Sequence, residues 1–472
     1  MSHLYQLLEN SITAYVAFAN GLSFLLMLVG YFALRRNNEA FSAPEIEGLL
    51  KSQLLPSVSV LAPAYNEAAT IRQSVRSMLR LRHSKVEVIV INDGSTDATL
   101  KELIDEFKLY RSSRSARGSL PTAGVRAVYE SRDQTPLLVI DKQNGGKADA
   151  LNCGINYAQH DLFAAIDADS IIEADALLHI SRPFLEYGDE TMAAGGIIRV
   201  ANGCAVSDGC VTGLALPRSL LARFQIVEYL RAFLAARVAM SFANSLLIVS
   251  GAFGLFRRTV VAAIGGYRLD TVGEDMELVV RIHRHCRETG LPCRIVFLSD
   301  SVCWTEAPES QRVLRRQRVR WQRGCFESIL LHKRMLGNWR FGSVGLLGLP
   351  YFVICEVVGP FVELGGYIAT ITGLCLGRLS AGSVLLFFAV SILFGLLMSI
   401  CSVLLEEMTI CKYPNPRDLL RLLCAAALEN IGYRQINLLW RVQAILQVLC
   451  RTQRSWGDME RRGFQPPHCA GP

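Results

Sequence analysis

Residues 87–97 read EVIVINDGSTD, an apolar run that ends in an acid, a glycine and two hydroxyl residues. A short β-branched run predicts a buried strand, and the polar residues after it are typical of a turn that opens a helix. Residues 57–62 form a similar run and lead into PAYNE at residues 63–67. Two more strand patterns lie at Leu137–Ile140 and Leu162–Ile166. Strands that alternate with helices predict an α/β domain with a mostly parallel sheet, which binds ligands at the carboxyl ends of its strands.

The first two strands each end in residues that could contact a nucleobase. Turn and helix-capping chemistry alone would explain both sequences. Because the two motifs follow consecutive strands, they could also hold a base, with Tyr65 stacking on it and Asp93 accepting a hydrogen bond from a base N–H. The sequence leaves both interpretations open.

Residues 144–152 read NGGKADALN. Two glycines would let backbone N–H groups approach a phosphate, and Lys147 would add a positive charge. The alternative is a loop that only begins a helix.

The fourth strand pattern runs into Asp167-Ala168-Asp169. Alternate residues of a strand share a face, so the two carboxylates would repel each other unless a cation lay between them. Oxygen ligands together with a diphosphate suit Mg²⁺ or Mn²⁺. Two solvated loop acids are the alternative.

Two motifs further along the chain could complete a reaction site. Residues 271–275 read TVGED and open an apolar-periodic helix, where Asp275 would serve either as a helix-start acid or as a general base. Residues 317–323 read QRVRWQR, on a predicted helix that precedes apolar sequence. This helix could bind phosphate and sugar, or lie on lipid headgroups, or do both.

Apolar segments flank the predicted α/β domain. Hydrophobic residues make up 51% of the 472 residues and charged residues 19%, which is more apolar than a soluble domain needs. Ile12–Leu34 has no charge and precedes Arg35–Arg36, so we expect a retained membrane helix with a cytoplasmic carboxyl end. Gly382–Leu405 is a second predicted span. Residues 343–377 form an apolar stretch broken by prolines and glutamates, which predicts broken helices, a polar cavity wall or a kinked helix.

The predicted organisation therefore has four parts: a transmembrane anchor at 1–36, a cytoplasmic domain at 50–340, membrane helices at 343–450 and a basic cytoplasmic tail at 451–472. Segment 419–449 carries charges, so we expect a hairpin or an interfacial helix there. The net charge of +7 is concentrated beside apolar segments, which favours an anionic membrane face or a phosphate-bearing substrate over nucleic acid. The 14 cysteines form no CxxC pair, so we expect reduced thiols in a cytosol-facing protein.

Asn-Asp-Gly-Ser, Asp-x-Asp, Gly-Glu-Asp and Gln-x-x-Arg-Trp, in this order over residues 55–325, resemble the motifs of processive family-2 glycosyltransferases. These include cellulose, hyaluronan, chitin and poly-N-acetylglucosamine synthases. The resemblance implies a GT-A nucleotide-sugar domain between an N-terminal transmembrane helix and a C-terminal α-helical membrane region. It also implies an inverting transfer from a UDP-sugar, of the UDP-GlcNAc or UDP-Glc type, to a growing β-linked glycan at a bacterial inner membrane.

The resemblance also implies roles for individual residues. Tyr65, Glu67 and Asp93 would hold uridine, Lys147 the diphosphate, and Asp167 and Asp169 the diphosphate with Mg²⁺ or Mn²⁺. Asp275 would be the base, with Glu274 beside it as the other candidate. Gln317, Arg320 and Trp321 would close the donor and acceptor sites, and Ser250 and Gly251 would lie near the acceptor sugar.

Two features depart from the family pattern. Gly273 stands where many relatives have threonine, and the tail after Cys450 is too short for the cyclic-di-GMP-binding module of bacterial cellulose synthases. We therefore expect a poly-N-acetylglucosamine-like or other synthase, or one regulated by an accessory export or regulatory subunit. The alternatives are an enzyme that glycosylates one membrane lipid, and a catalytically silent scaffold for polysaccharide export.

Overall fold

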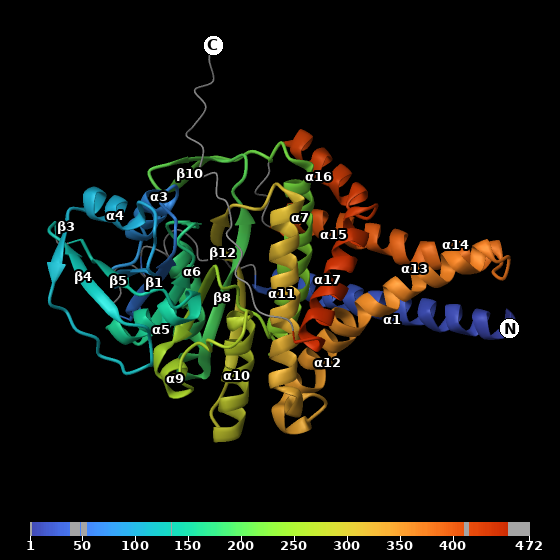
Figure 1. Cartoon of the computed structure of the whole chain (residues 1–472), viewed down its shortest axis with the longest axis horizontal. Helices are drawn as coiled ribbons and strands as arrows, with labels where there is room; N and C mark the ends of the chain where they lie inside the picture. Colours follow the sequence, from blue (N-terminus) through green and yellow to red (C-terminus); the bar gives the residue numbers. More distant parts are fainter. Residues whose placement is uncertain (1, 38–47, 49–53, 134, 410–414, 452–472) are drawn as a thin grey trace, which may run out of the picture. The chain divides into compact units, whose positions relative to one another are not determined.

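The computed structural model describes residues 2–37, 48, 54–133, 135–409 and 415–451 (Figure 1). The chain forms two compact units, which we describe separately. Among the described residues, the sheet unit comprises 54–218 and Leu246–Ala307, and the helical unit comprises 2–37, Ser219–Ser245 and 308–451. Residues 219–245 and 308–340, which lie inside the predicted cytoplasmic domain, group with the membrane-type helices.

Four parallel strands form the centre of the sheet unit, in the order β5-β2-β1-β6. They are β1 (Val58–Ala64), β2 (Val86–Asn92), β5 (Leu137–Lys142) and β6 (Leu162–Ile166). The interior residues of these strands are buried on both faces, as expected for a parallel sheet covered by helices. The four strand patterns found in the sequence are therefore confirmed.

The flanks of the same sheet are mixed: β8 and β12 pair parallel, but the other flank pairings are antiparallel, so the prediction of a mostly parallel sheet holds at the centre and for this one flank pair. β4 pairs antiparallel with β5, and β11 pairs antiparallel with both β6 and β8. The flanking strands are β3 (Leu109–Ser112), β4 (Val125–Ser131), β7 (Ile171–Ile172), β8 (Thr191–Val200), β11 (Phe253–Arg257) and β12 (Arg294–Thr305). The mixed directions bring β11 beside β6, and so bring the Ser250–Gly251 turn beside Asp167.

Helices cover both the centre and one flank of the sheet (Figure 1). α5 packs on β1 and β2, and α6 packs on β8 and β12. A Cβ at Gly154 would lie 3.0 Å from the Ile91 side chain, so this glycine lets α5 approach the sheet closely. The helices of this unit are α3 (Ile71–Leu79), α4 (Thr99–Phe107), α5 (Lys147–Tyr157), α6 (Ala176–Glu186), α9 (Arg258–Ala263) and α10 (Glu274–Thr289). A hairpin of β9 (Ala205–Ser207) and β10 (Cys210–Gly213) completes it.

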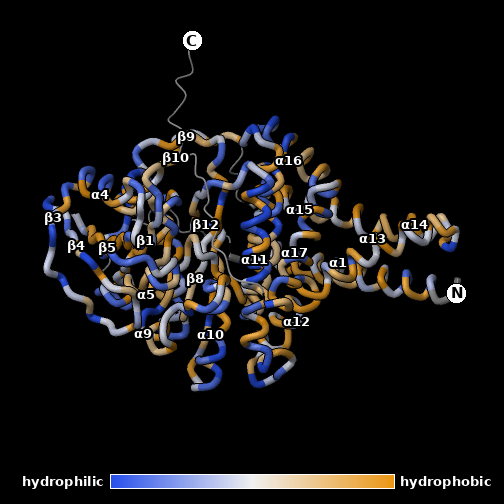
Figure 2. The backbone as a smooth tube through the Cα atoms, in the orientation of Figure 1, coloured by the Kyte–Doolittle hydropathy of each residue, from blue (hydrophilic) through white to orange (hydrophobic). Residues whose placement is uncertain are grey.

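The helical unit contains three helical runs long and apolar enough to cross a membrane, within the described residues: Tyr5–Arg36, Val344–Cys375 and Ala381–Met408. Both predicted spans lie inside such runs. Figure 2 shows apolar residues along α1 (Ser2–Asn37), α13 (Gly359–Cys375) and α14 (Ala381–Phe388). α1 packs against α13 and α14. The remaining long helices are α7 (Leu220–Leu230), α11 (Gln311–Leu331), α15 (Phe394–Thr409), α16 (Pro416–Leu428) and α17 (Tyr433–Leu449).

The proline-containing stretch is one helical path rather than separate broken helices. It runs through η5 (Val344–Gly348), α12 (Leu349–Phe352) and η6 (Val353–Val358) into α13, and both η5 and η6 are π-helical. Pro350 lies in the first turn of α12 and Pro360 in the first turn of α13, the positions of a helix where proline is most common. A wider π-helical turn precedes each proline and accommodates the change in the backbone hydrogen-bond pattern.

Segment 419–449 is not one continuous helix. α16 ends at Leu428, a turn follows, and α17 begins at Tyr433. Glu429 lies in this turn and is 2% exposed, because it pairs with Arg231 at 2.7 Å. The expectation of a hairpin or an interfacial helix in this segment stays a prediction. Apart from Arg451, the predicted basic tail lies outside the described residues.

Candidate active site

A lysine and an aspartate meet at the carboxyl edge of the central strands. Lys147 is the first residue of α5, and its Nζ lies 2.5 Å from Oδ1 of Asp167, which follows β6. The same Nζ donates to the carbonyl oxygen of Gly251 at 3.1 Å. Residues from three separate motifs therefore converge on one ammonium group.

Asp275 contacts the same cluster through the backbone N–H of Gly251. Its Oδ2 accepts from the N–H of Gly251 at 3.2 Å, and its Oδ1 accepts from the N–H of Met276 at 2.8 Å. Gly273 occupies the N-cap position of α10, and Asp275 is the second residue of the helix. Asp275 is therefore a first-turn acid that the helix dipole favours, rather than the cap itself. Its carboxylate is half-buried.

The charges of this site perturb two neighbouring groups. Burial lowers the pKa of Lys147, but the carboxylates of Asp167, Glu274 and Asp275 outweigh it, so the pKa lies above its ordinary value. Burial raises the pKa of Tyr267 well above its usual range, and the charges of Glu274, Asp275 and Asp167 raise it further. Lys147 therefore stays protonated at neutral pH.

A side chain at Gly251 would be crowded by its neighbours. A Cβ at this position would lie 3.1 Å from Lys147 Nζ and 3.5 Å from Asp275 Oδ2. Ser250 shapes the same turn, because its hydroxyl accepts from the N–H of Ala252 at 3.4 Å and its carbonyl from the N–H of Phe253 at 3.1 Å. Gly251 thus bonds Lys147 through its carbonyl and Asp275, the candidate base, through its N–H.

Asp167 and Asp169 do not share a strand face, so that part of the argument from sequence is wrong. β6 ends at Ile166, and the N–H of Ser170 donates to the carbonyl of Asp167 at 3.0 Å, which makes the segment a turn. The Asp167 side chain is 30% exposed, whereas Asp169 is 3% exposed and its Oδ1 accepts from the Ser170 hydroxyl at 3.2 Å. Alternation along a strand does not apply to a turn.

The two acids nevertheless lie near each other. Burial raises the pKa of the Cys303 thiol, and the charges of both Asp167 and Asp169 raise it further. Within the described residues, no group of three or more His, Cys, Asp and Glu side chains is arranged to hold a metal ion alone. Mg²⁺ commonly takes one or two carboxylates and completes its shell with water and substrate phosphates. The donor set fits a cation of that kind.

Asp93 is buried, and its carboxylate holds the glycine loop. Its Oδ1 accepts from Lys142 Nζ at 2.6 Å and from the N–H of Gly145 at 3.0 Å, and its Oδ2 accepts from the N–H of Gly146 at 2.7 Å. The two glycine N–H groups that were expected to approach a phosphate are thus taken up by Asp93. Contact between Asp93 and a nucleobase stays a prediction.

Lys142 is a residue that the sequence reasoning missed. Its side chain has no exposed surface, and its Nζ also lies 2.6 Å from Oδ1 of Asp149. One buried cation thus links the carboxylate after β2 to the first turn of α5. The available signal was the lysine at the end of β5, which follows an apolar run and Asp141, because a buried charge requires partners.

Tyr65 and Glu67 lie in a loop tied to the turn after β2. Asn66 adopts a left-handed backbone (φ +56°), and its Oδ1 accepts from the N–H of Thr96 at 2.8 Å. The N–H of Glu67 donates to Thr99 Oγ1 at 2.8 Å, and its carboxylate accepts from Thr70 at 2.9 Å. Tyr65 is 44% exposed, so its ring is free to stack on a planar ligand.

Gln317, Arg320 and Trp321 lie on α11 of the helical unit, which confirms the predicted helix. Gln317 is buried, Arg320 is half-buried and Trp321 is 42% exposed. The Trp321 ring has the Arg318 guanidinium 4.6 Å from its centroid. Arg318 in turn pairs with the half-buried Glu228 at 2.9 Å, so a partly buried ion pair supports the aromatic surface.

The chain belongs to the glycosyltransferase-like family 2, whose family model matches residues 56–324. It is 27% identical over 277 residues to the poly-beta-1,6-N-acetyl-D-glucosamine synthase of Staphylococcus aureus, which covers 58% of this chain and 56% of the relative. The synthase of the same name from Staphylococcus epidermidis is 28% identical over 317 residues, covering 65% of this chain and 66% of the relative. The chain thus spans between about half and two thirds of the length of these relatives.

A solved structure supports the GT-A fold. A mannosyltransferase from Pyrobaculum calidifontis in complex with GDP-Man and Mn²⁺ superposes with a TM-score of 0.56 at 19% identity, over 89% of this chain and 99% of the other. The predicted α/β class is confirmed, and the described residues include three apolar helical runs that could span a membrane, one before the sheet unit in the sequence and two after it.

Proposed function

We propose that this chain is a membrane-embedded inverting glycosyltransferase that polymerises a β-linked polysaccharide from a UDP-sugar, of the UDP-GlcNAc or UDP-Glc type. The observation that carries this proposal is the contact path from Asp167 through Lys147 and Gly251 to Asp275. Gly251 alone bridges Lys147, whose charge suits a diphosphate, and Asp275, whose carboxylate suits a general base. The names of the matched synthases support a UDP-N-acetylglucosamine donor.

In this proposal, Asp275 accepts the proton of the acceptor hydroxyl while that oxygen forms a bond to the anomeric carbon. The bond from that carbon to the diphosphate breaks on the opposite face, which inverts the configuration, and UDP leaves with the electron pair. Lys147 lies where it stabilises the negative charge that develops on the leaving group. Asp167 and Asp169 would hold Mg²⁺ or Mn²⁺, which supplies further charge stabilisation when bound.

The remaining predicted residues have supporting roles in the same proposal. Tyr65, Glu67 and Asp93 bind uridine, Ser250 and Gly251 line the acceptor side, and Gln317, Arg320 and Trp321 close the site. Glu274 is the second candidate base. The catalytic domain, 50–340, is cytoplasmic at a bacterial inner membrane, with the helices of 343–450 in the bilayer. An accessory subunit for export or regulation would complete the system.

The test is a panel of UDP-sugars offered to the purified full-length enzyme in lipid nanodiscs, with UDP release and product length as readouts. We expect one donor to give UDP release and a polymer ladder, and Asp169→Asn and excess EDTA each to stop turnover. Transfer of one sugar to a lipid, without a ladder, would replace polymerisation with lipid glycosylation. No release from any donor, by protein that is folded and inserted, would contradict the proposed activity.

A further inference from the structure

α11 continues past Trp321 into a residue that the proposed reaction does not use. Gln322 is buried, and its Nε2 donates to the backbone carbonyl of Glu356 at 2.6 Å. Glu356 lies in η6, inside the apolar run Val344–Cys375. A side chain of the helix that carries Gln317, Arg320 and Trp321 thus bonds the backbone of a membrane-type helix.

Pro360 explains why backbone carbonyls are open at that point. Proline has no N–H, so Pro360 cannot donate to the carbonyl of residue 356 in the α-helical pattern or to the carbonyl of residue 355 in the π-helical pattern. The N–H of Gly359 bonds the carbonyl of Ile354 in the π pattern, so it does not serve Cys355. The carbonyls of Cys355 and Glu356 therefore need donors from elsewhere, since orphaned carbonyls in an apolar setting are costly. We call these two carbonyls the Pro360 socket.

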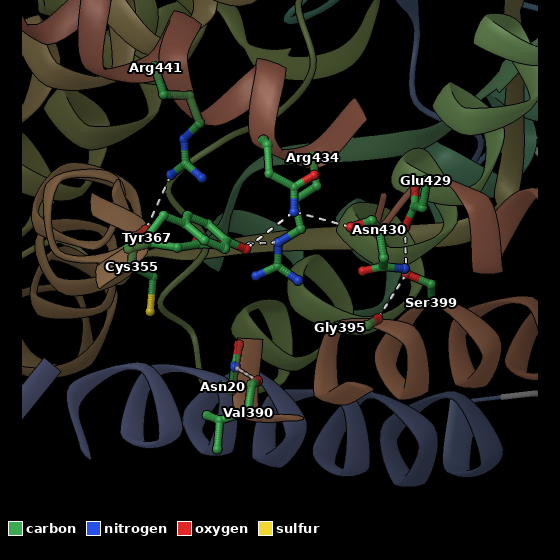
Figure 3. Close-up of polar contacts among 12 residues, drawn as sticks. Asn20, Cys355, Tyr367, Val390, Gly395, Ser399, Glu429, Asn430, Arg434 and Arg441 are labelled. Carbon is green, nitrogen blue, oxygen red and sulfur yellow. Dashed lines mark hydrogen bonds and ion pairs between the residues drawn. The ribbon is translucent and has the colours of Figure 1, made fainter. Parts of the chain in front are cut away.

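Arg441 of α17 supplies the other donors to the Pro360 socket. Its Nη2 donates to the carbonyl oxygens of Cys355 and Glu356, each at 3.2 Å, and to Oε2 of Glu356 at 2.7 Å. Figure 3 shows Arg441 reaching toward the helix that carries Cys355. The Nε of Arg441 donates to Oε1 of Gln322 at 3.2 Å. Gln322 and Arg441 therefore bond each other as well as the socket.

A second ion pair sets the register of α17 on this span. Arg434 pairs with Glu363 at 3.5 Å, and Arg441 pairs with Glu356 at 2.7 Å. The two arginines are seven residues apart, and so are the two glutamates. The arginine with the lower number pairs with the glutamate with the higher number. α17 thus runs antiparallel to the path from η6 into α13, with two matched pairs two helical turns apart.

We propose that Gln322 and Arg441 are positioning residues that dock α11 onto the Pro360 socket, and so hold Gln317, Arg320 and Trp321 in place for the reaction. This inference rests on the proposed function for its catalytic consequence. It names a site in the membrane-type helices to which α11 hydrogen-bonds through Gln322. Displacement of a positioning element by about 1 Å can cost on the order of 10²-fold in rate.

Two variants test the docking from opposite sides. Arg441→Met removes the donors, and Pro360→Ala restores an N–H at residue 360 that competes for the Glu356 carbonyl without altering either side chain. For both we expect kcat for UDP release to fall about 10- to 100-fold. The dissociation constant for UDP should stay within about twofold, because Lys147 and Asp167 are untouched. Gln443→Leu is the matched control, since Gln443 accepts from the exposed Arg315 of α11, away from the Pro360 socket, and its loss should leave kcat unchanged.

Hydrogen exchange of the α11 amides reads the docking without any catalysis. We expect faster exchange over residues 317–322 in Arg441→Met and Pro360→Ala than in wild type and Gln443→Leu. Normal kcat in both folded variants, or equal loss in Gln443→Leu, overturns the positioning role. Unchanged exchange overturns the docking itself. A wild-type protein that releases no UDP would remove the proposed function, and the exchange result would still decide the docking.

Discussion

Replacement of Asp275 by asparagine separates its two candidate roles more sharply than any other substitution. Asparagine is isosteric, so its side-chain oxygen can still accept from the N–H of Gly251 or of Met276. Gly273 is the N-cap, so no cap is lost. The stability cost is then the loss of one negative charge in the first turn of α10, about 0.3–1 kcal/mol. A missing general base costs about 10²–10⁴-fold in rate.

The assay is UDP release by the purified enzyme, beside its thermal unfolding and its affinity for UDP. We expect kcat to fall by at least about 10²-fold, with UDP affinity and melting temperature close to those of wild type. Asp270→Asn is the control, because it removes an equal charge from an exposed residue paired with Arg268 on the same segment. A kcat within tenfold of wild type would refute the assignment of Asp275 as the base, and Glu274→Gln would then be tested.

Three further perturbations have defined outcomes. Gly251→Ala should lower kcat by about 10²-fold with little change in melting temperature, because its Cβ would press on Lys147 Nζ at 3.1 Å; kcat near the wild-type value would show that the turn yields. Lys142→Met should destabilise the protein by about 3–5 kcal/mol, because it leaves the buried carboxylates of Asp93 and Asp149 without their cation. Denaturant unfolding measures this loss of stability. Burial lowers the pKa of His83 to about 4, from about 6.5 when unfolded. The unfolded chain therefore binds the proton first on acidification, so the free energy of unfolding should fall between pH 6.5 and 4 by up to about 3 kcal/mol, and His83→Gln should flatten that slope.

Local sequence was enough to predict the strands and the polar residues that follow them. β-branched runs that are too short for helices predicted β1, β2, β5 and β6, because a residue pattern reports local burial. The same reasoning placed Asp167, Lys147 and Asp275 at element ends, which is where the structure has them. It erred where direction mattered: the antiparallel flanks depend on how distant strands pair, which no single strand pattern contains.

What the sequence determined by itself is therefore the central sheet, the apolar spans and the identity of the charged groups near the site. Tertiary structure alone decided which groups meet. The fold pairs Asp93 with Lys142 across neighbouring strands, although 49 positions separate them, and it puts Gly251 between Lys147 and Asp275. The sequence shows that Pro360 must disturb a helix. It does not show that Gln322 and Arg441 donate the hydrogen bonds to the backbone carbonyls of the Pro360 socket. Hydrogen bonds and ion pairs act over a few ångströms, so their partners are set by packing rather than by order along the chain.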